Sequence, residues 1–473
     1  MTTTVSVSLL IFTIIYIVMF TFQKIRPFAA VFGAAVFVLL GSTDVLPGFH
    51  YTLSDALSAV DFNVILMLAG TMGTVSLFIE SSMPALLSDI LISKTPDLRS
   101  AVVALSLFAG LISAFVDNVA TVLMIAPVAL AFCKKCGISP VAPMICISVS
   151  SNLQGAATLV GDTTSVLLSK AAGLDFTDFF VDHGRVGMFF VVEAGALVGA
   201  AMVFFMFRRE KSPVVCTQRT VVKDKVPTVL LVLTVLSLIA ASFVPYKENA
   251  APGALYKPEI ANGLICVFFC LIGLFRKMLK ERSASALFSM VKEIDFLTLL
   301  LLAGLFAVIG AVSEAGVIKL IGSTISKLGR GANGVFIVYT MLVWVSVLLS
   351  AFIDNIPYTA TMLPVVAVIA HDLSVVDGLS IEPKLLYYGL ICGATLGGNL
   401  TPIGASANIA ALGILRKEGY RVSSGEFMKY AVLFTLSAVV TGYVLIGLIW
   451  TLFFSFLPLV RILLSCCCFV GKR

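Results

Sequence analysis

The sequence has little charge. Only 12% of its 473 residues are Asp, Glu, Lys or Arg, whereas 59% are hydrophobic; soluble domains carry roughly 25% charged residues. No hydrophilic stretch is long enough to fold as a separate soluble domain, and apolar runs of about 20 residues recur along the chain. This composition predicts an all-α polytopic membrane protein.

The motifs of several protein classes are also missing. The chain has three His residues, and none belongs to a His-Glu-x-x-His pattern or to a Ser-His-Asp set at membrane depth. There is no Gly-x-x-x-x-Gly-Lys-Ser/Thr loop that could hold ATP phosphates. The basic residues occupy short loops between apolar segments, so the net charge of +6 does not indicate nucleic acid binding. We therefore expect neither an enzyme nor a self-contained ATP-driven pump, and no cofactor apart from a coupling ion.

The flanking charges of one apolar run indicate that it does not simply cross the membrane. Lys94 and Arg99 precede the run 100–132, and Lys134 follows it. Because basic loops face the cytoplasm, the run begins and ends on the same side. A re-entrant hairpin with its tip near Asp117 satisfies this condition.

Four segments of the first half recur in the second half in the same order. "SAFVDNVATVLMIAPV" at 113–128 matches "SAFIDNIPYTATMLPV" at 350–365 without a gap, and "TLVGDTTS" at 158–165 matches "TPIGASAN" at 401–408. The first copy begins at a cytoplasmic loop and the second at an external one, so the copies should have inverted topology. Inverted repeats with interrupted helices are typical of secondary transporters.

The repeat divides the chain into five predicted parts. They are an N-terminal transmembrane helix (1–22), repeat 1 (23–208), a cytoplasmic basic linker (209–226), repeat 2 (227–455) and a C-terminal tail (456–473). Each repeat is expected to contain one re-entrant hairpin and one unwound transmembrane helix.

Each hairpin tip carries an Asp-Asn pair, Asp117-Asn118 and Asp354-Asn355. An ionisable residue at the bilayer centre costs about 2.5–3.5 kcal/mol even on the lenient insertion scale, and a turn at that depth must face protein or water. Each Asp could cap the following helix. Two equivalent caps at two helix breaks nevertheless favour a shared cavity that binds a substrate or ion.

A second polar cluster follows each hairpin, at 148–165 and at 393–408. Gly and Pro at this density favour unwound backbone, whose free carbonyls and amides can bind ions. Close helix packing would explain the Gly and Ala residues, but not Asn152 or Thr158. The predicted binding residues are Asp117, Asn118, Asn152, Thr158, Gly161, Asp162, Ser165, Asp354, Asn355, Asn399, Thr401, Gly404 and Asn408. We expect no metal cofactor; a coupling Na⁺ would lie near Asp117, Asn118, Asp354 and Asn355.

With these motifs the chain resembles the Ion Transporter superfamily, which includes divalent anion:sodium symporters, citrate-transporter-like carriers, arsenite-efflux permeases and NhaD-type sodium/proton antiporters. The resemblance covers residues from about 23 to 455. It implies a scaffold domain that usually forms a homodimer, a transport domain that moves as an elevator, and Asn118, Thr158, Asn355 and Thr401 close to the substrate or coupling ion.

The Asp at each tip differs from the dicarboxylate branch of that superfamily, which has Ser there, and is more like the arsenite, NhaD and metal-citrate branches. No Arg at membrane depth is available to pair with an anion, and Lys170 is the nearest basic residue. We therefore expect a multi-pass protein of the cell membrane that carries a small ion or anion and binds H⁺ or Na⁺ at Asp117 and Asp354. Anion transport, Na⁺/H⁺ antiport and arsenite efflux stay open, as does an ion channel outside the transporter class.

Overall fold

The computed structural model describes residues 3–43, 45–209, 220–247, 255–282, 291–329, 334–377 and 382–452. The predicted C-terminal tail (456–473) and most of the basic linker lie outside these ranges. Within them the regular structure is helical apart from one hairpin of two two-residue strands and one isolated bridge, and nine helices are long and apolar enough to cross a membrane. The prediction of an all-helical polytopic protein is confirmed.

The first half contains these elements: α1 (Thr3–Thr21), η1 (Gln23–Ile25), α2 (Arg26–Ser42), α3 (Leu53–Ala59), α4 (Phe62–Glu80), α5 (Met83–Ser93), α6 (Leu98–Ser113), α7 (Asn118–Cys136), α8 (Val141–Gly155), α9 (Thr163–Ala172), η2 (Phe176–Phe179), β1 (Val181–Asp182), β2 (Arg185–Val186) and α10 (Met188–Met206). The second half contains α11 (Val226–Ser242), α12 (Ala261–Glu281), α14 (Phe296–Glu314), α15 (Val317–Ser326), η4 (Lys327–Gly329), α16 (Gly334–Ser350), α17 (Asn355–Asp377), α18 (Pro383–Gly397), η5 (Gly398–Leu400), α19 (Ser406–Lys417), α20 (Ser424–Gly447) and η6 (Leu448–Leu452).

Short polar side chains fix where several helices begin. The Asp61 carboxylate accepts the backbone N–H of Val64 at 3.0 Å and so caps α4. Asp295 caps α14 in the same way. A carboxylate at this position satisfies an otherwise unpaired amide and opposes the positive end of the helix dipole.

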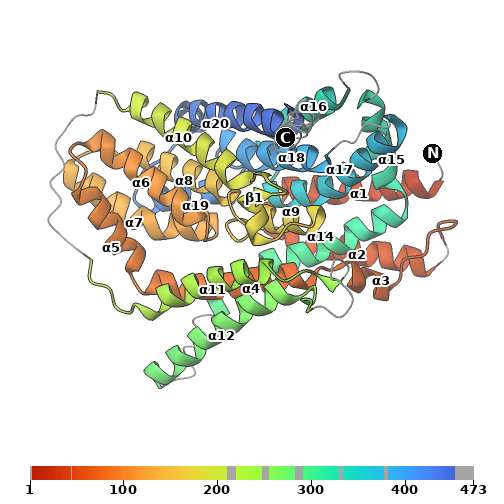
Figure 1. The fold of residues 1–473 in the computed structure, drawn as a ribbon, viewed down its shortest axis with the longest axis horizontal. Helices are drawn as coiled ribbons and strands as arrows, with labels where there is room; N and C mark the ends of the chain where they lie inside the picture. Colours follow the sequence, from red (N-terminus) through yellow and green to blue (C-terminus); the bar gives the residue numbers. More distant parts are fainter. Residues whose placement is uncertain are drawn as a thin grey trace, which may run out of the picture.

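The helices form two groups, which occupy the upper and the lower part of the molecule in Figure 1. The core group consists of α6, α8, α10, α16, α18 and α20, and its members pack on one another. The flanking group consists of α2, α4, α11, α12 and α14, within which α4 packs on α12 and α2 packs on α14. The α7 and α17 arms of the helix–turn–helix units α6–α7 and α16–α17 contact this flanking group, α7 at α4 and α17 at α14.

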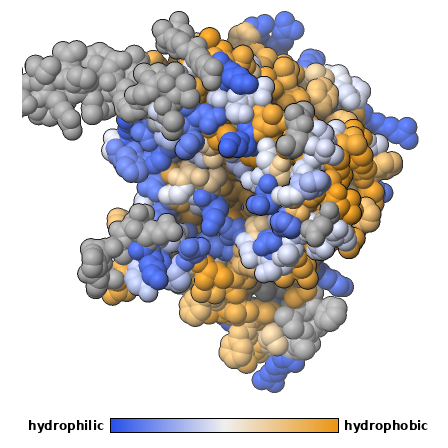
Figure 2. Space-filling model, turned by 90° about the vertical axis from the view of Figure 1, so that its right-hand side faces the viewer, coloured by the Kyte–Doolittle hydropathy of each residue, from blue (hydrophilic) through white to orange (hydrophobic). Residues whose placement is uncertain are grey.

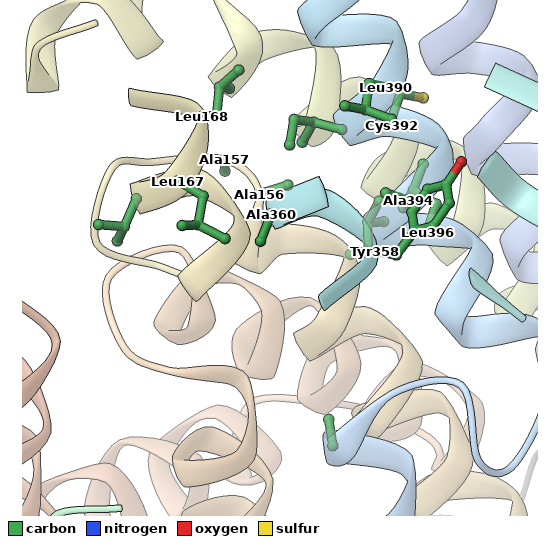
Figure 3. Packing of buried hydrophobic residues seen from close by; sticks show 14 of the residues in the cluster. Ala156, Ala157, Leu167, Leu168, Tyr358, Ala360, Leu390, Cys392, Ala394 and Leu396 are labelled. Carbon is green, nitrogen blue, oxygen red and sulfur yellow. The ribbon is translucent and has the colours of Figure 1, made fainter. Parts of the chain in front are cut away.

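Small residues allow these helix pairs to approach closely. A Cβ added to Gly70 of α4 would lie 2.4 Å from the backbone of Cys266 in α12, and one added to Gly393 of α18 would lie 2.3 Å from the Val343 carbonyl in α16. Close backbone approach at small residues is how helices pack where water supplies no driving force between them. In the core group the packing continues through buried apolar side chains such as Ala394 and Leu396 (Figure 3).

The outer helix faces are apolar. Large exposed hydrophobic side chains include Phe32 of α2, Leu197 of α10, Phe268 of α12 and Leu348 of α16. Figure 2 shows apolar residues over a large part of one face, with hydrophilic residues gathered in another part of it. Exposed apolar faces on long helices are expected for a protein surrounded by lipid.

Two pairs of breaks interrupt the long helices. The helix–turn–helix units turn at 114–117, between α6 and α7, and at 351–354, between α16 and α17. Non-helical residues also separate α8 from α9 at 156–162 and follow η5 at 401–405 before α19. All four breaks fall in the segments where the sequence predicts them. Each α7 or α17 arm packs across onto the other half of the chain, α7 on α19 and α17 on α9.

Candidate functional site

The acidic residue at each turn caps the helix that follows. Asp117 accepts the backbone N–H groups of Val119 at 3.0 Å and Ala120 at 3.1 Å. Asp354 accepts the N–H of Ile356 at 3.2 Å. Capping is therefore part of the role of both residues, and it fixes each carboxylate at the tip of its turn.

The unwound segments are attached to these turns by matching hydrogen bonds. The Thr158 hydroxyl donates to the Ala114 carbonyl in the first half, and the Thr401 hydroxyl donates to the Ala351 carbonyl in the second. Both Thr side chains are buried. These two bonds join each helix break to the neighbouring tip.

Two glycines let the segments come this close. A Cβ on Gly161 would lie 2.5 Å from the Gly155 carbonyl oxygen and 2.8 Å from that of Ala114. A Cβ on Gly404 would lie 2.6 Å from the Gly398 oxygen and 2.8 Å from that of Ala351. The third atom near each added Cβ is also a backbone oxygen, that of Ser113 at 2.8 Å or of Ser350 at 2.9 Å. Because backbone atoms cannot move aside as a flexible side chain can, only glycine fits at either position.

A chain of buried amides connects the two halves. Asn118 donates to the Asn152 side-chain oxygen at 2.8 Å, and Asn152 donates to the Asn399 side-chain oxygen at 3.0 Å and to the Thr395 carbonyl at 2.9 Å. Asn399 in turn donates to the Val149 carbonyl at 2.9 Å. The three Asn residues are 0–5% exposed, so a network of this kind fixes one relative position of the helices.

Asp162 is held by three hydrogen bonds. It is 4% exposed and accepts the N–H of Thr163 at 2.7 Å, the hydroxyl of Thr164 at 2.9 Å and the side-chain amide of Asn355 at 3.3 Å. The corresponding residue before α19 is Ala405, which caps nothing. The third carboxylate therefore has no counterpart in the second half.

The last two predicted residues support the breaks. The Ser165 hydroxyl donates to the Gly155 carbonyl at 3.3 Å, and the Asn408 amide donates to the carbonyls of Gly398 and Thr401, both at 3.2 Å. They hold each unwound segment back onto the end of the helix before it.

A cavity of about 240 Å³ lies between the first tip, residues beside the second tip (Asn355, Ile356 and Ser406), and helices α4 and α14 of the flanking group. Its lining includes four carboxylates, Asp117, Asp162, Glu293 and Asp295, and among the described residues that line it none is Lys, Arg or His. The remaining lining residues are Met72, Val75, Ser76, Ile79, Asn118, Val119, Ala120, Leu123, Thr163, Thr298, Asn355, Ile356 and Ser406. Carboxylate, amide and hydroxyl oxygens in a site without cations are ligands for a small hard cation or acceptors for a proton.

The structure separates the predicted residues into two sets. Asp117, Asn118, Asp162 and Asn355 line the cavity. The others are part of the surrounding hydrogen-bonded framework, except for Asp354, which lines a second cavity of about 410 Å³ together with Arg26. No group of three or more His, Cys, Asp or Glu residues in the described part of the chain has metal-binding geometry.

Sequence reasoning missed Glu293, Asp295 and Arg26. An Asp at the start of an apolar run is typical of a helix cap, which Asp295 is, but it also lines the cavity together with Asp117. The expectation that no Arg is available inside the protein was wrong: Nη1 of Arg26 lies 3.0 Å from Oδ2 of Asp354, and the Arg26 side chain is only 12% exposed. An Arg at the start of an apolar helix was the available signal. Lys170, the basic residue the sequence favoured, instead lies 3.3 Å from Asp61 and is mostly exposed.

Comparison with known proteins gives the family. The chain matches the citrate transporter family over residues 15–388. The uncharacterized transporter Rv2684 of Mycobacterium tuberculosis is 31% identical over 427 residues, which are 89% of this chain and 93% of that protein. The human P protein is 26% identical over 446 residues, 80% of this chain and 52% of its own length.

Two solved structures have a similar fold. The Alcanivorax borkumensis YdaH transporter superposes with a TM-score of 0.55 at 14% identity, covering 91% of this chain and 97% of its own. Neisseria gonorrhoeae MtrF gives 0.52 at 15% identity, covering 91% and 94%. The resemblance to the Ion Transporter superfamily is thereby confirmed. The chain is a multi-pass membrane protein and not an enzyme, and it belongs to the citrate transporter family of secondary transporters.

Proposed function

We propose that this transporter is driven by H⁺ or Na⁺ bound at the cavity carboxylates, chiefly Asp117 and Asp162. The observation that supports this proposal is the composition of the cavity, which has four acids and no basic residue among its described lining. Asp162 is buried and Asp117 is half-buried, whereas Glu293 and Asp295 are exposed. A carboxylate that is removed from water favours protonation or a bound cation over an isolated negative charge.

The same charge restricts the cargo. Two like charges about 4 Å apart repel by roughly 4 kcal/mol at an effective dielectric constant of 20. A bare carboxylate anion would therefore be excluded, whereas an anion that enters with H⁺ or a metal cation would not. Because the family is that of citrate transporters, the first candidate cargo is a small carboxylate accompanied by a cation.

A second candidate is exchange of cations, or efflux of a neutral solute against H⁺ or Na⁺. It is favoured by the absence of a basic residue from the described cavity lining, because such a cavity offers no positively charged group that would bind an anion. The solved structure of MtrF is described as that of an antimetabolite efflux pump. The flux measurements below distinguish these two candidates by their cargo and by the direction of transport.

Alternating access would come from movement of the core group against the flanking group. The matched tips, the matched Thr bonds and the matched glycines support two repeats of opposite orientation, each with a re-entrant hairpin. Such repeats are the usual basis of alternating access. The cavity lies between α4 and α14 of the flanking group and the starts of α7, α9, α17 and α19, where relative movement would change its access. The homodimer and the cell-membrane location stay predictions of the resemblance.

The test is flux into proteoliposomes containing the purified full-length protein. ²²Na⁺, citrate and arsenite uptake are each measured under imposed pH and Na⁺ gradients, for the wild type and for Asp117→Asn. We expect at least one gradient-driven flux in the wild type and its loss, at least about tenfold, in the variant, because an uncharged amide cannot take up H⁺ or hold Na⁺ by charge. Lys134→Gln is the control, since Lys134 pairs with Glu418 at the surface. Undiminished gradient-driven flux in Asp117→Asn would contradict the proposal.

The inverted topology has its own test. Single cysteines placed in the loop 45–52 and in the segment 220–225 are labelled from one side of a sealed membrane. The proposal expects reaction from opposite sides. Labelling of both positions from the same side would contradict it.

A further inference from the structure

The Asp354 carboxylate at the second tip already has a cationic partner. Nη1 of Arg26 donates to its Oδ2 at 3.0 Å, and the two side chains are 12% and 5% exposed. Asp354 also accepts the Ser406 hydroxyl at 3.2 Å and the Ile356 N–H at 3.2 Å. The carboxylate thus has both a compensating charge and hydrogen bonds from protein groups.

The partner is held in place by its own helix turn. Nε of Arg26 donates to the Met19 carbonyl at 3.1 Å, which directs the guanidinium from the turn between α1 and α2 toward the tip. Close by, the Tyr16 hydroxyl donates to the Pro357 carbonyl at 3.0 Å. α1 and α2 therefore contact the second tip at two points.

The first tip lacks such a partner. Asp117 accepts only backbone N–H groups, from Val119 and Ala120, and forms no ion pair within the described ranges. The other charged groups around its cavity are acids. Two turns of nearly identical sequence thus differ in charge compensation: the Asp of the second is neutralised by an Arg, and the Asp of the first has other acids around it.

We propose that Arg26 is a built-in counter-ion for Asp354. Its guanidinium neutralises the carboxylate at the second tip, as the coupling cation neutralises Asp117 at the first. Arg26 is a positioning and charge-compensating residue, and it leaves one acidic tip rather than two open to H⁺ or Na⁺. This inference rests on the proposed function, because it assumes that Asp117 binds the coupling cation. It changes the expected number of coupling ions for each transport cycle.

The proposal is tested by the charge displaced when a cation binds, which requires no knowledge of the cargo. Proteoliposomes with the full chain are adsorbed to a solid-supported membrane and exposed to a Na⁺ jump and, separately, to a pH jump. The displaced charge is normalised to the amount of protein. Flux is expected to fall in every variant of the pair, so the quantity compared is displaced charge and not flux.

Removal of Arg26 should open a second site. Arg26→Gln leaves Asp354 buried without compensation, so we expect the displaced charge to rise about twofold, since an isolated buried carboxylate takes up a cation or proton. Arg26→Lys, which keeps the charge, should return it toward the wild-type value. The double variant Arg26→Gln/Asp354→Asn removes both partners and should also give the wild-type charge. A residue with a merely structural role would not produce this pattern.

Two results would overturn the inference. One is an unchanged displaced charge in Arg26→Gln. If Asp117→Asn then gives no displaced charge, the proposed function is still supported and only the role of Arg26 is refuted. The other, available even if Arg26→Gln fails to fold, is a displaced charge that falls by about half in Asp354→Asn, because Asp354 would then bind a cation in the wild type. A full signal in Asp117→Asn would instead refute the proposed function itself.

Discussion

The turns at 114–117 and 351–354 begin from nearly the same residues, "SAFVDN" and "SAFIDN", and have matching backbone arrangements. In each, an Asp caps the next helix and a Thr from the following unwound segment donates to an Ala carbonyl. Their charge partners differ. Asp117 faces a cavity with three further acids, whereas Asp354 is paired with an Arg 328 residues away in the chain. Local sequence thus sets the geometry of a tip, and the helices packed against it set its electrostatic state.

The sharpest way to break the comparison is to remove the acid that only one half has. Asp162→Asn should lower the gradient-driven flux at least about tenfold, because the cavity loses a charge that Asn355 and Thr164 hold in place. The measurement is the proteoliposome flux described above. Asp97→Asn is the matched control, since Asp97 caps α6 by accepting the Ser100 N–H outside the cavity. Normal flux in Asp162→Asn would show that the asymmetry between the halves has no part in coupling.

The two glycine contacts should behave alike. Gly161→Ala and Gly404→Ala each force a Cβ against three backbone carbonyl oxygens, so each should cost up to about 3 kcal/mol of stability. Heating the detergent-purified protein and measuring the fraction that stays folded by size-exclusion chromatography gives the comparison. Gly413→Ala in α19 is the control, because nothing lies within 4 Å of an added Cβ there. Tolerance of either site variant would mean that its break is less tightly packed than described.

The amide chain between the halves should contribute somewhat less. Asn152→Leu removes the acceptor for Asn118 and the donor to Asn399, leaving buried polar groups unpaired at a cost of about 2 kcal/mol. Thermal stability measured as above should fall accordingly. Ser93→Ala, at an exposed hydroxyl, is expected to cause little change. Equal stability of Asn152→Leu and Ser93→Ala would exclude a structural role for the hydrogen-bonded amides.

The smallest loss of stability is expected on removal of the two Thr hydroxyls, and it should be equal in the two halves. Thr158→Val and Thr401→Val keep the shape of the side chain and remove one hydroxyl bond each, so each should cost about 1 kcal/mol. The same heating experiment should give equal losses for the two variants. A loss confined to one of them would show that the two unwound segments are not equivalent.

Much of the site could be predicted from local sequence. The breaks at 114–117 and 351–354 follow from Asp-Asn pairs in apolar runs, and the unwound segments follow from their Gly and Pro content. Helix capping depends on residues within three positions, so the roles of Asp61 and Asp295 as caps were also predictable. Arg26 and Glu293 were not, since nothing near them in the chain indicates which tip or cavity they approach.

The sequence by itself determined a helical membrane protein with a duplicated arrangement of acids, amides and helix breaks, because hydropathy, capping and chain breaking act over a few neighbouring residues. Only the tertiary structure decided that Asp117 shares a cavity with Asp162 and Asp295, that Asn152 reaches Asn399, and that Asp354 pairs with Arg26. Those contacts join segments far apart in the chain, and the energy of a charge depends on which groups packing brings within a few ångströms of it.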